Sequence, residues 1–201
     1  MTKKRAVFFD RDGTINRDVG YPNSYDMVEI FRYSFASVRK INEAGFLSVI
    51  VTNQSGIGRG FIEEKNLHDI HRKLRLDFAK HKASFDGIYY CPHYEHSEIK
   101  KYRKSCSCRK PNPGMALKAA RELNIDTARS FMIGDKLEDI LFGKNIKATS
   151  ILLLTGFGRK TLPKLKEKGI EPAHIAETLE GAVDWILKRE QRKSQSIMAV
   201  I

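Results

Sequence analysis

Short apolar runs alternate along this chain with longer stretches of helical periodicity, and this alternation restricts the possible folds more than any other feature. Such alternation is typical of βαβ units, which build a mostly parallel sheet with helices packed on it. We therefore predict an α/β, doubly wound fold. The expected strands are Ala6 to Asp10, Phe46 to Thr52, Phe85 to Cys91, Ser130 to Gly134 and Ser150 to Thr155.

Apolar spacing and capping residues mark the expected helices. Apolar residues at spacings of three and four predict one buried helix face; they are Leu67, Ile70, Leu74 and Phe78. A second helix should begin near Phe35 and end at Gly45, a residue suited to a left-handed stop. A third should run from about Pro113 to Leu123, with Asn112 as its N-cap.

The composition fits one domain. The chain has 201 residues, of which 41% are hydrophobic and 30% charged, as in ordinary globular proteins. We expect a single domain over residues 1–190 and a C-terminal tail over 191–201, because periodicity fades from Arg189 and a frayed end is expected there. Three cysteines cannot all pair, and no apolar signal segment opens the chain, which favours the reducing cytoplasm. No apolar run approaches the roughly 20 residues of a membrane span.

The formal net charge of +12 favours anionic partners. Nucleic acids and phosphorylated metabolites both qualify. Basic runs such as KKYRK and RKTLPKLKEK are also explained as solvated surface, so charge alone does not choose between these classes.

Polar and acidic residues follow three of the expected strands. Asp10 and Asp12 follow the first strand and precede Gly13, Thr52 ends the second, and Asp135 follows the fourth. Parallel strands present their carboxyl ends at one edge of the sheet, where ligands bind. Carboxylates at i and i+2 in extended backbone point to one side and suit Mg²⁺.

Each of these residues has an ordinary explanation when taken alone. An acidic loop after a strand is common, and Asp135 could be a helix N-cap. The combination is much less ordinary: acid, hydroxyl and acid at three strand ends, with Lys110 available from a loop on the same side.

Four ordered motifs carry a family resemblance: Phe-Phe-Asp-Arg-Asp-Gly-Thr, Val-Thr-Asn, Lys-Pro and Gly-Asp-Lys-Leu-Glu-Asp. They resemble the motifs of the haloacid dehalogenase superfamily of phosphotransferases. Within it, Thr-Asn-Gln-Ser-Gly-Ile, Tyr-Tyr-Cys-Pro-His and Cys-Ser-Cys-Arg-Lys-Pro resemble the D-glycero-D-manno-heptose 1,7-bisphosphate 7-phosphatases. The resemblance is close over about residues 5–156 and implies a sugar-bisphosphate phosphatase.

The resemblance also implies roles for individual residues. Asp10 would attack phosphorus, and Asp12 would first donate and later accept a proton. Thr52 and Lys110 would hold the transferring phosphoryl group. Mg²⁺ would be bound by the Asp10 and Asp135 side chains and the Asp12 carbonyl, with Asp139 in support. The expected substrate-binding residues are Asp18, Gly20, Tyr21, Asn53, Gln54, Ser55, Arg109 and Lys136.

All three cysteines lie in the segment 91–110. Cys91, His93, Cys106 and Cys108 form two short ligand pairs. Three thiolates and one imidazole suit a tetrahedral, structural Zn²⁺, and the resembling family binds zinc through the same pattern. His96 is a rival fourth ligand. A buried-cysteine explanation is poor, because this lysine-rich loop offers little to bury them.

We expect the fold to be capless, with the zinc-binding loop in the place of a cap domain. The loop ends in Arg109 and Lys110, and Arg109 would grip the second phosphate of the substrate. Zinc would fix a loop that is otherwise costly to order.

Two other functions stay open. The first is histidinol-phosphate phosphatase, whose family shares the motifs and the zinc loop; the Asn-Gln-Ser-Gly-Ile loop and Arg109 favour the heptose instead. The second is a nucleic-acid-binding protein or polynucleotide 3′-phosphatase, which the scarcity of aromatics among the basic runs disfavours. We expect a small sugar phosphate as partner, and a monomer.

Overall fold

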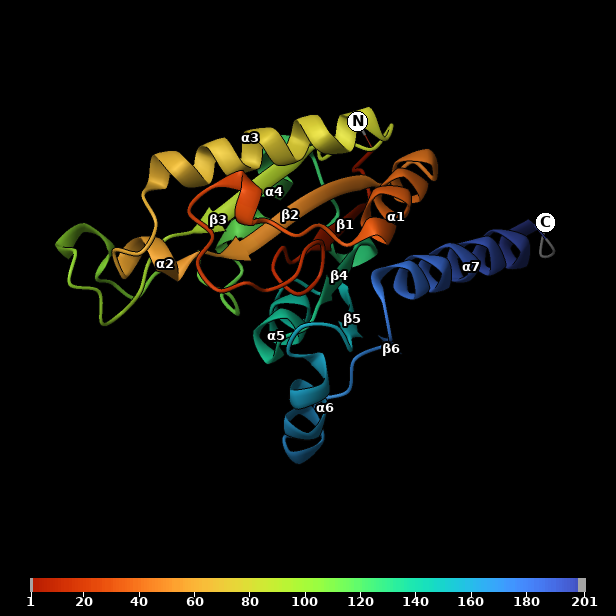
Figure 1. Cartoon of the computed structure of the whole chain (residues 1–201). Coiled ribbons are helices and arrows are strands. Elements are labelled where there is room, and N and C mark those ends of the chain that lie inside the picture. Colours follow the sequence, from red (N-terminus) through yellow and green to blue (C-terminus); the bar gives the residue numbers. More distant parts are fainter. Residues whose placement is uncertain (1, 199–201) are drawn as a thin grey trace.

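The computed structural model describes residues 2–198 and contains one six-stranded parallel sheet in the order β3-β2-β1-β4-β5-β6 (Figure 1). The strands are β1 (Ala6–Phe9), β2 (Leu47–Asn53), β3 (Gly87–Cys91), β4 (Phe131–Gly134), β5 (Thr149–Leu153) and β6 (His174–Ala176). All neighbouring strands pair in parallel. The predicted doubly wound α/β fold is therefore confirmed.

Helices cover both faces of this sheet. They are α1 (Arg32–Glu43), α2 (Ser55–Gly58), α3 (Glu64–Lys80), α4 (Gly114–Leu123), α5 (Leu137–Asn145), α6 (Gly158–Glu167) and α7 (Leu179–Met198), with short 3-10 turns at Tyr25–Met27, Lys100–Tyr102 and Thr127–Arg129. After α1 the chain turns at Gly45, whose φ of +76° confirms the predicted left-handed stop.

The central strand divides the core into two layers. Val7 and Phe9 point to the face covered by α1, α3 and α7, while Ala6 and Phe8 point to the face covered by α4 and α5. All four side chains are fully buried. Burying each phenylalanine contributes roughly 2–3 kcal/mol, so β1 is held firmly from both sides.

Two predicted details of the elements are wrong. Strand β6 was missed because its three residues form a short edge strand without an apolar run. Pro113, not Asn112, caps α4. The Asn112 side chain instead donates to the Cys106 carbonyl oxygen at 2.8 Å and so ties the cysteine loop to the start of α4.

The C-terminal helix is longer than the sequence indicated. Helix α7 continues to Met198, so the frayed end expected from Arg189 is wrong for this stretch; residues 199–201 lie outside the described residues. An ion pair between Arg5 and Glu190 ties the helix to the start of β1. Within residues 2–198, no helix is both long and apolar enough to cross a bilayer.

Candidate active site

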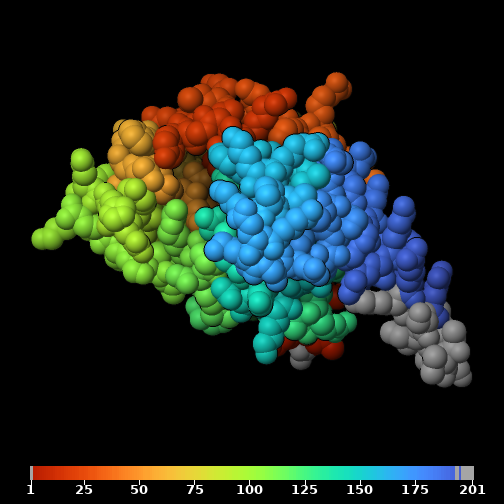
Figure 2. Space-filling model, turned by 90° about the horizontal axis from the view of Figure 1, so that it is seen from below, coloured from red at the N-terminus to blue at the C-terminus, as the bar shows by residue number. Residues whose placement is uncertain are grey.

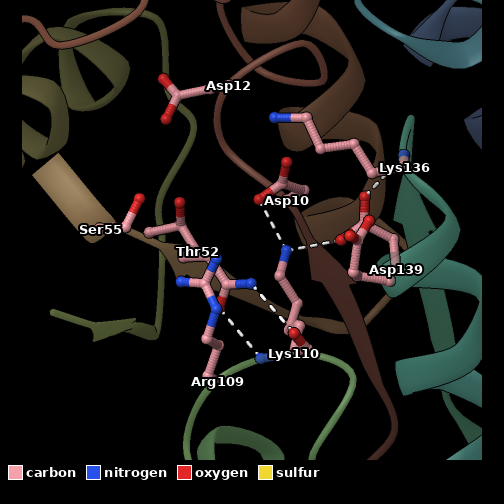
Figure 3. Close-up of a pocket in the computed structure, with 10 residues that line it drawn as sticks. Asp10, Asp12, Thr52, Ser55, Arg109, Lys110, Lys136 and Asp139 are labelled. Carbon is pink, nitrogen blue, oxygen red and sulfur yellow. Dashed lines mark hydrogen bonds and ion pairs between the residues drawn. The ribbon is translucent and has the colours of Figure 1, made fainter. Parts of the chain in front are cut away.

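The carboxyl ends of β1, β2 and β4 meet at one edge of the sheet. They bring together Asp10, Thr52 and Asp135, and the Asp10 amide donates to the Ile133 carbonyl oxygen at 2.9 Å. A pocket of about 150 Å³ opens at this edge (Figure 3); its lining residues are Asp10, Asp12, Thr52, Asn53, Ser55, Arg109, Lys110, Lys136, Glu138 and Asp139.

Three carboxylates and one ammonium group form the floor of the site. Oxygens of Asp10, Asp135 and Asp139 lie within 4.8 Å of one another. Lys110 Nζ lies 2.7 Å from Asp10 Oδ1 and 2.6 Å from Asp139 Oδ1, and its side chain is only 3% exposed (Figure 3). Lys110 is thus a cation buried between two acids.

Crowding of negative charge changes the acidity of this cluster. Burial raises the pKa of Asp10 to about 6, with Lys110 opposing the rise. Burial and the neighbouring carboxylates of Asp10 and Asp139 raise the pKa of Asp135 to about 8. The site therefore needs more positive charge than Lys110 supplies.

The surroundings of Asp135 fit a cation. Its Oδ2 accepts from the Phe157 amide at 2.7 Å, but its Oδ1 is buried without any hydrogen-bond partner. Gly13 and Gly156 enclose it closely, because a Cβ at either glycine would lie 2.3 or 2.2 Å from Oδ2. An unpartnered carboxylate oxygen beside two more carboxylates is a donor set that Mg²⁺ prefers.

Asp12 does not stand beside Asp10 as the sequence suggested. That expectation assumed extended backbone, but β1 ends at Phe9 and the chain turns, with the Ile15 amide donating to the Arg11 carbonyl oxygen. The Asp12 carboxylate lies apart from Asp10 and Asp139 (Figure 3) and is bound by Arg11 through Nε and Nη2. Although burial alone would raise it, the pKa of Asp12 is lowered by Arg11 and by hydrogen bonds.

The expected substrate-binding residues fall into two groups. Asn53, Ser55, Arg109 and Lys136 line the pocket. The other four do not line it. Asp18 accepts a hydrogen bond from Lys136 Nζ at 2.9 Å, and Gln54 is buried. Gly20 and Tyr21 are exposed on the loop between β1 and α1.

Gln54 has no free amide group for a sugar. Its Nε2 donates to Asp12 Oδ2 and to Thr52 Oγ1, each at 2.8 Å. Two residues of the site were not predicted: Glu138, which lines the pocket, and Arg11, which holds Asp12. Arg11 lies in the motif Phe-Phe-Asp-Arg-Asp-Gly-Thr and Glu138 in Gly-Asp-Lys-Leu-Glu-Asp, so membership of these motifs was the sequence signal that could have identified them.

The cysteine loop contains a second compact cluster. Ligand atoms of Cys91, His93, Cys106 and Cys108 all lie within 4.8 Å of one another, and His96 is outside this group. Mutual hydrogen bonding raises the pKa of Cys91 and lowers that of Cys108 to about 5. Three sulfurs and one ring nitrogen make up the four ligands of a tetrahedral site and are compatible with structural zinc.

The loop packs against the segment that follows β2. Ser97 donates its hydroxyl to the Gly58 carbonyl oxygen, and the Arg59 guanidinium lies 3.7 Å from the centre of the Tyr94 ring. Asn53 and Lys110 also exchange two hydrogen bonds, of 3.0 and 3.2 Å. The outer part of the loop projects from the body of the protein, at the left of Figure 2.

Known proteins resemble this chain in sequence. Residues 107–182 match the HAD-hydrolase-like family model. The D-glycero-β-D-manno-heptose-1,7-bisphosphate 7-phosphatase of Pasteurella multocida is 45% identical over 76% of this chain and 83% of its own length. The protein of the same name from Escherichia coli K12 is 40% identical, with 90% of this chain and 87% of its own length covered.

Solved structures agree with the sequence comparison. The D,D-heptose 1,7-bisphosphate phosphatase of B. bronchiseptica, complexed with magnesium and phosphate, is 30% identical with a TM-score of 0.81 over 92% of this chain and 99% of its own. The corresponding protein of Burkholderia thailandensis is 28% identical, with a TM-score of 0.67 over 92% and 99%. The chain therefore belongs to the heptose-1,7-bisphosphate 7-phosphatase family of haloacid dehalogenase-like phosphomonoester hydrolases.

Proposed function

We propose that this protein is a cytoplasmic, Mg²⁺-dependent and monomeric enzyme that hydrolyses the 7-phosphate of D-glycero-D-manno-heptose 1,7-bisphosphate. The observation that carries the proposal is the buried cluster of Asp10, Asp135 and Asp139 around Lys110, in a chain 40–45% identical to heptose bisphosphate phosphatases. A phosphate monoester is the anion that such a cluster binds once a divalent cation is present.

Asp10 is the nucleophile of the proposed reaction. An Oδ atom attacks phosphorus, the bond from phosphorus to the sugar oxygen breaks, and an aspartyl phosphate forms. Lys110 Nζ, 2.7 Å from Asp10 Oδ1, neutralises charge as the phosphoryl group approaches, and Thr52 donates its hydroxyl to a phosphoryl oxygen. Mg²⁺, held by Asp10, Asp135 and the Asp12 carbonyl, would supply the remaining positive charge.

Asp12 carries the proton in both halves of the reaction. Arg11 keeps Asp12 ionised in the free protein, so the carboxylate would take up a proton as the anionic substrate binds. The carboxyl group would then protonate the leaving sugar oxygen, and the resulting carboxylate would take a proton from the water that attacks the aspartyl phosphate. Phosphate leaves and Asp10 is regenerated. The lining of the pocket by both Asp10 and Asp12 supports this division of labour.

Arg109 would bind the distant 1-phosphate through two parallel N–H donors. It precedes Lys110 and lines the same pocket. Zinc on Cys91, His93, Cys106 and Cys108 would hold both residues in place. Histidinol phosphate has only one phosphate group, so it would leave Arg109 without a partner.

Steady-state phosphate release from the heptose bisphosphate and from histidinol phosphate, with and without Mg²⁺, tests the proposal. We expect a kcat/KM at least about tenfold higher for the heptose, since a bidentate charged contact is worth 1.4 kcal/mol or more. Asp10→Asn should remove turnover of both compounds. A preference for histidinol phosphate, or full activity of Asp10→Asn, would contradict the proposal.

A further inference from the structure

Arg11 is a fully buried arginine between the proposed nucleophile and the proposed acid. It is the largest side chain within residues 2–198 that is fully shielded from solvent. A buried guanidinium is costly unless its charge and its N–H donors are matched. Neither binding of the phosphoryl group nor attack on it requires this residue, so its presence needs another explanation.

The shortest hydrogen bonds of Arg11 go to Asp12, and Nη2 also donates to Gln54 Oε1 at 3.3 Å. Nε and Nη2 donate to Asp12 Oδ1 at 3.0 and 2.9 Å, and Nη2 also reaches Oδ2 at 2.8 Å. Asn16 Nδ2 and Gln54 Nε2 complete the set, at 2.9 and 2.8 Å from the same carboxylate. Asp12 is nevertheless 9% exposed and lines the pocket, so Arg11 grips it from the interior side.

His71 closes this network from a helix that contributes no residue to the pocket lining. It lies on α3, and its Nε2 is 3.3 Å from Arg11 Nη1. Burial, with the charge of Arg11, holds the pKa of His71 well below its usual value, so the ring is neutral. A neutral imidazole can accept a hydrogen bond from the guanidinium, whereas an imidazolium would repel it.

We propose that Arg11 and His71 are positioning residues for proton transfer by Asp12. His71 fixes the guanidinium, and the guanidinium fixes the carboxylate at the wall of the pocket. This inference rests on the proposed function, because it assigns a purpose to the same proton transfer. Neither residue lines the pocket, so neither would touch the substrate.

Two substrates with different leaving groups distinguish this role from a merely structural one. An alkoxide leaving from a sugar phosphate needs a proton as the ester bond breaks, whereas p-nitrophenolate is stable as an anion. The value of kcat/KM reports the steps up to departure of the leaving group. A misplaced Asp12 should therefore lower kcat/KM for the sugar ester and spare the aryl ester.

The experiment compares His71→Leu, which removes the acceptor, with His71→Gln, which retains one. We expect His71→Leu to lower kcat/KM about tenfold for the heptose bisphosphate and less than about twofold for p-nitrophenyl phosphate. His71→Gln should stay close to wild type with both substrates. His68→Leu, on the exposed side of the same helix, is the matched control and should leave both values unchanged.

Arg11→Lys provides a second variant should His71→Leu fail to fold. Lysine keeps the charge but cannot bind a carboxylate through two N–H groups, so the same selective loss is expected. Equal losses on the two esters, or no loss on either, would overturn the inference. If the wild type fails to cleave the heptose bisphosphate, the proposed function fails separately, and the comparison is repeated with histidinol phosphate, another alkyl ester.

Discussion

The acidic edge of the sheet and the cysteine loop are held in place by different forces. Asp10 and Asp135 follow strands whose side chains are buried on both faces and whose backbones pair with neighbouring strands. The loop from Cys91 to Lys110 is largely exposed, but its cysteines are not. Contrary to the expectation that little could bury them, Cys91 is fully buried, and Cys106 and Cys108 pack against the same apolar layer beside α4. The loop's only contribution to the acid cluster, Lys110, is likewise as buried as the acids.

This difference separates the roles that we propose for the two metals. The carboxylates should stay in place without zinc, since the sheet positions them. Lys110 should not, because its backbone belongs to a segment that zinc would organise. Two hydrogen bonds between Lys110 and Asn53 connect the regions.

The largest effect should come from removing Lys110 itself. Lys110→Met leaves Asp10 and Asp139 facing each other without the cation between them. We expect kcat/KM to fall about 10³-fold, the upper range for loss of one group that stabilises transition-state charge. Phosphate-release kinetics measure this, and Lys104→Met, on an exposed residue of the same loop, should retain wild-type rates.

Disrupting the zinc cluster should have the next largest effect. Cys106→Ser removes one ligand, and a shift of Lys110 by about 1 Å would lower kcat/KM about a hundredfold. Magnesium affinity, measured by isothermal titration, should change little, because the three carboxylates stay on the sheet. Ser105→Ala, at a neighbouring exposed position, is the control. Loss of both zinc and magnesium binding in Cys106→Ser would show that the regions are not independent.

The smallest effect concerns stability and pH. The pKa values of Asp10 and Asp135 are raised to about 6 and about 8 in the folded protein, above their values in the unfolded chain. The folded state then binds more protons than the unfolded state, so the free energy of unfolding falls as pH rises toward about 8. We expect the Tm of metal-free protein to decrease by a few degrees between about pH 6 and pH 8.

Two further measurements identify the groups that make the Tm depend on pH. Excess Mg²⁺ should flatten this dependence, because a bound cation favours the ionised carboxylates. Asp135→Asn lacks the group with the higher pKa and should show a weaker slope without metal. A Tm that rises over this interval in the metal-free wild type would contradict the assigned charge cluster.

The sequence predicted those parts of the site that depend on strand order. Asp10, Thr52 and Asp135 each follow an apolar run, and parallel strands necessarily place such residues at one edge. The cysteine–histidine cluster was also identifiable, because the spacing within each of its two ligand pairs is local.

Contacts between distant segments could not be predicted in the same way. The turn after β1 directs Asp12 toward Arg11, and His71 reaches Arg11 from α3. No short pattern encodes either contact. The extension of α7 to Met198 was missed for a related reason, since Glu190 contributes to it through an ion pair with Arg5, at the opposite end of the sequence.

The close packing around Asp135 restricts how this site can change. Gly13 and Gly156 approach it from two separate loops, and both have a positive φ, of 90° and 50°. Even a methyl group at either position would collide with the carboxylate. A change of substrate would therefore have to come from the outer wall of the pocket, where Arg109, Ser55 and Glu138 lie, with the surroundings of Asp135 kept as they are.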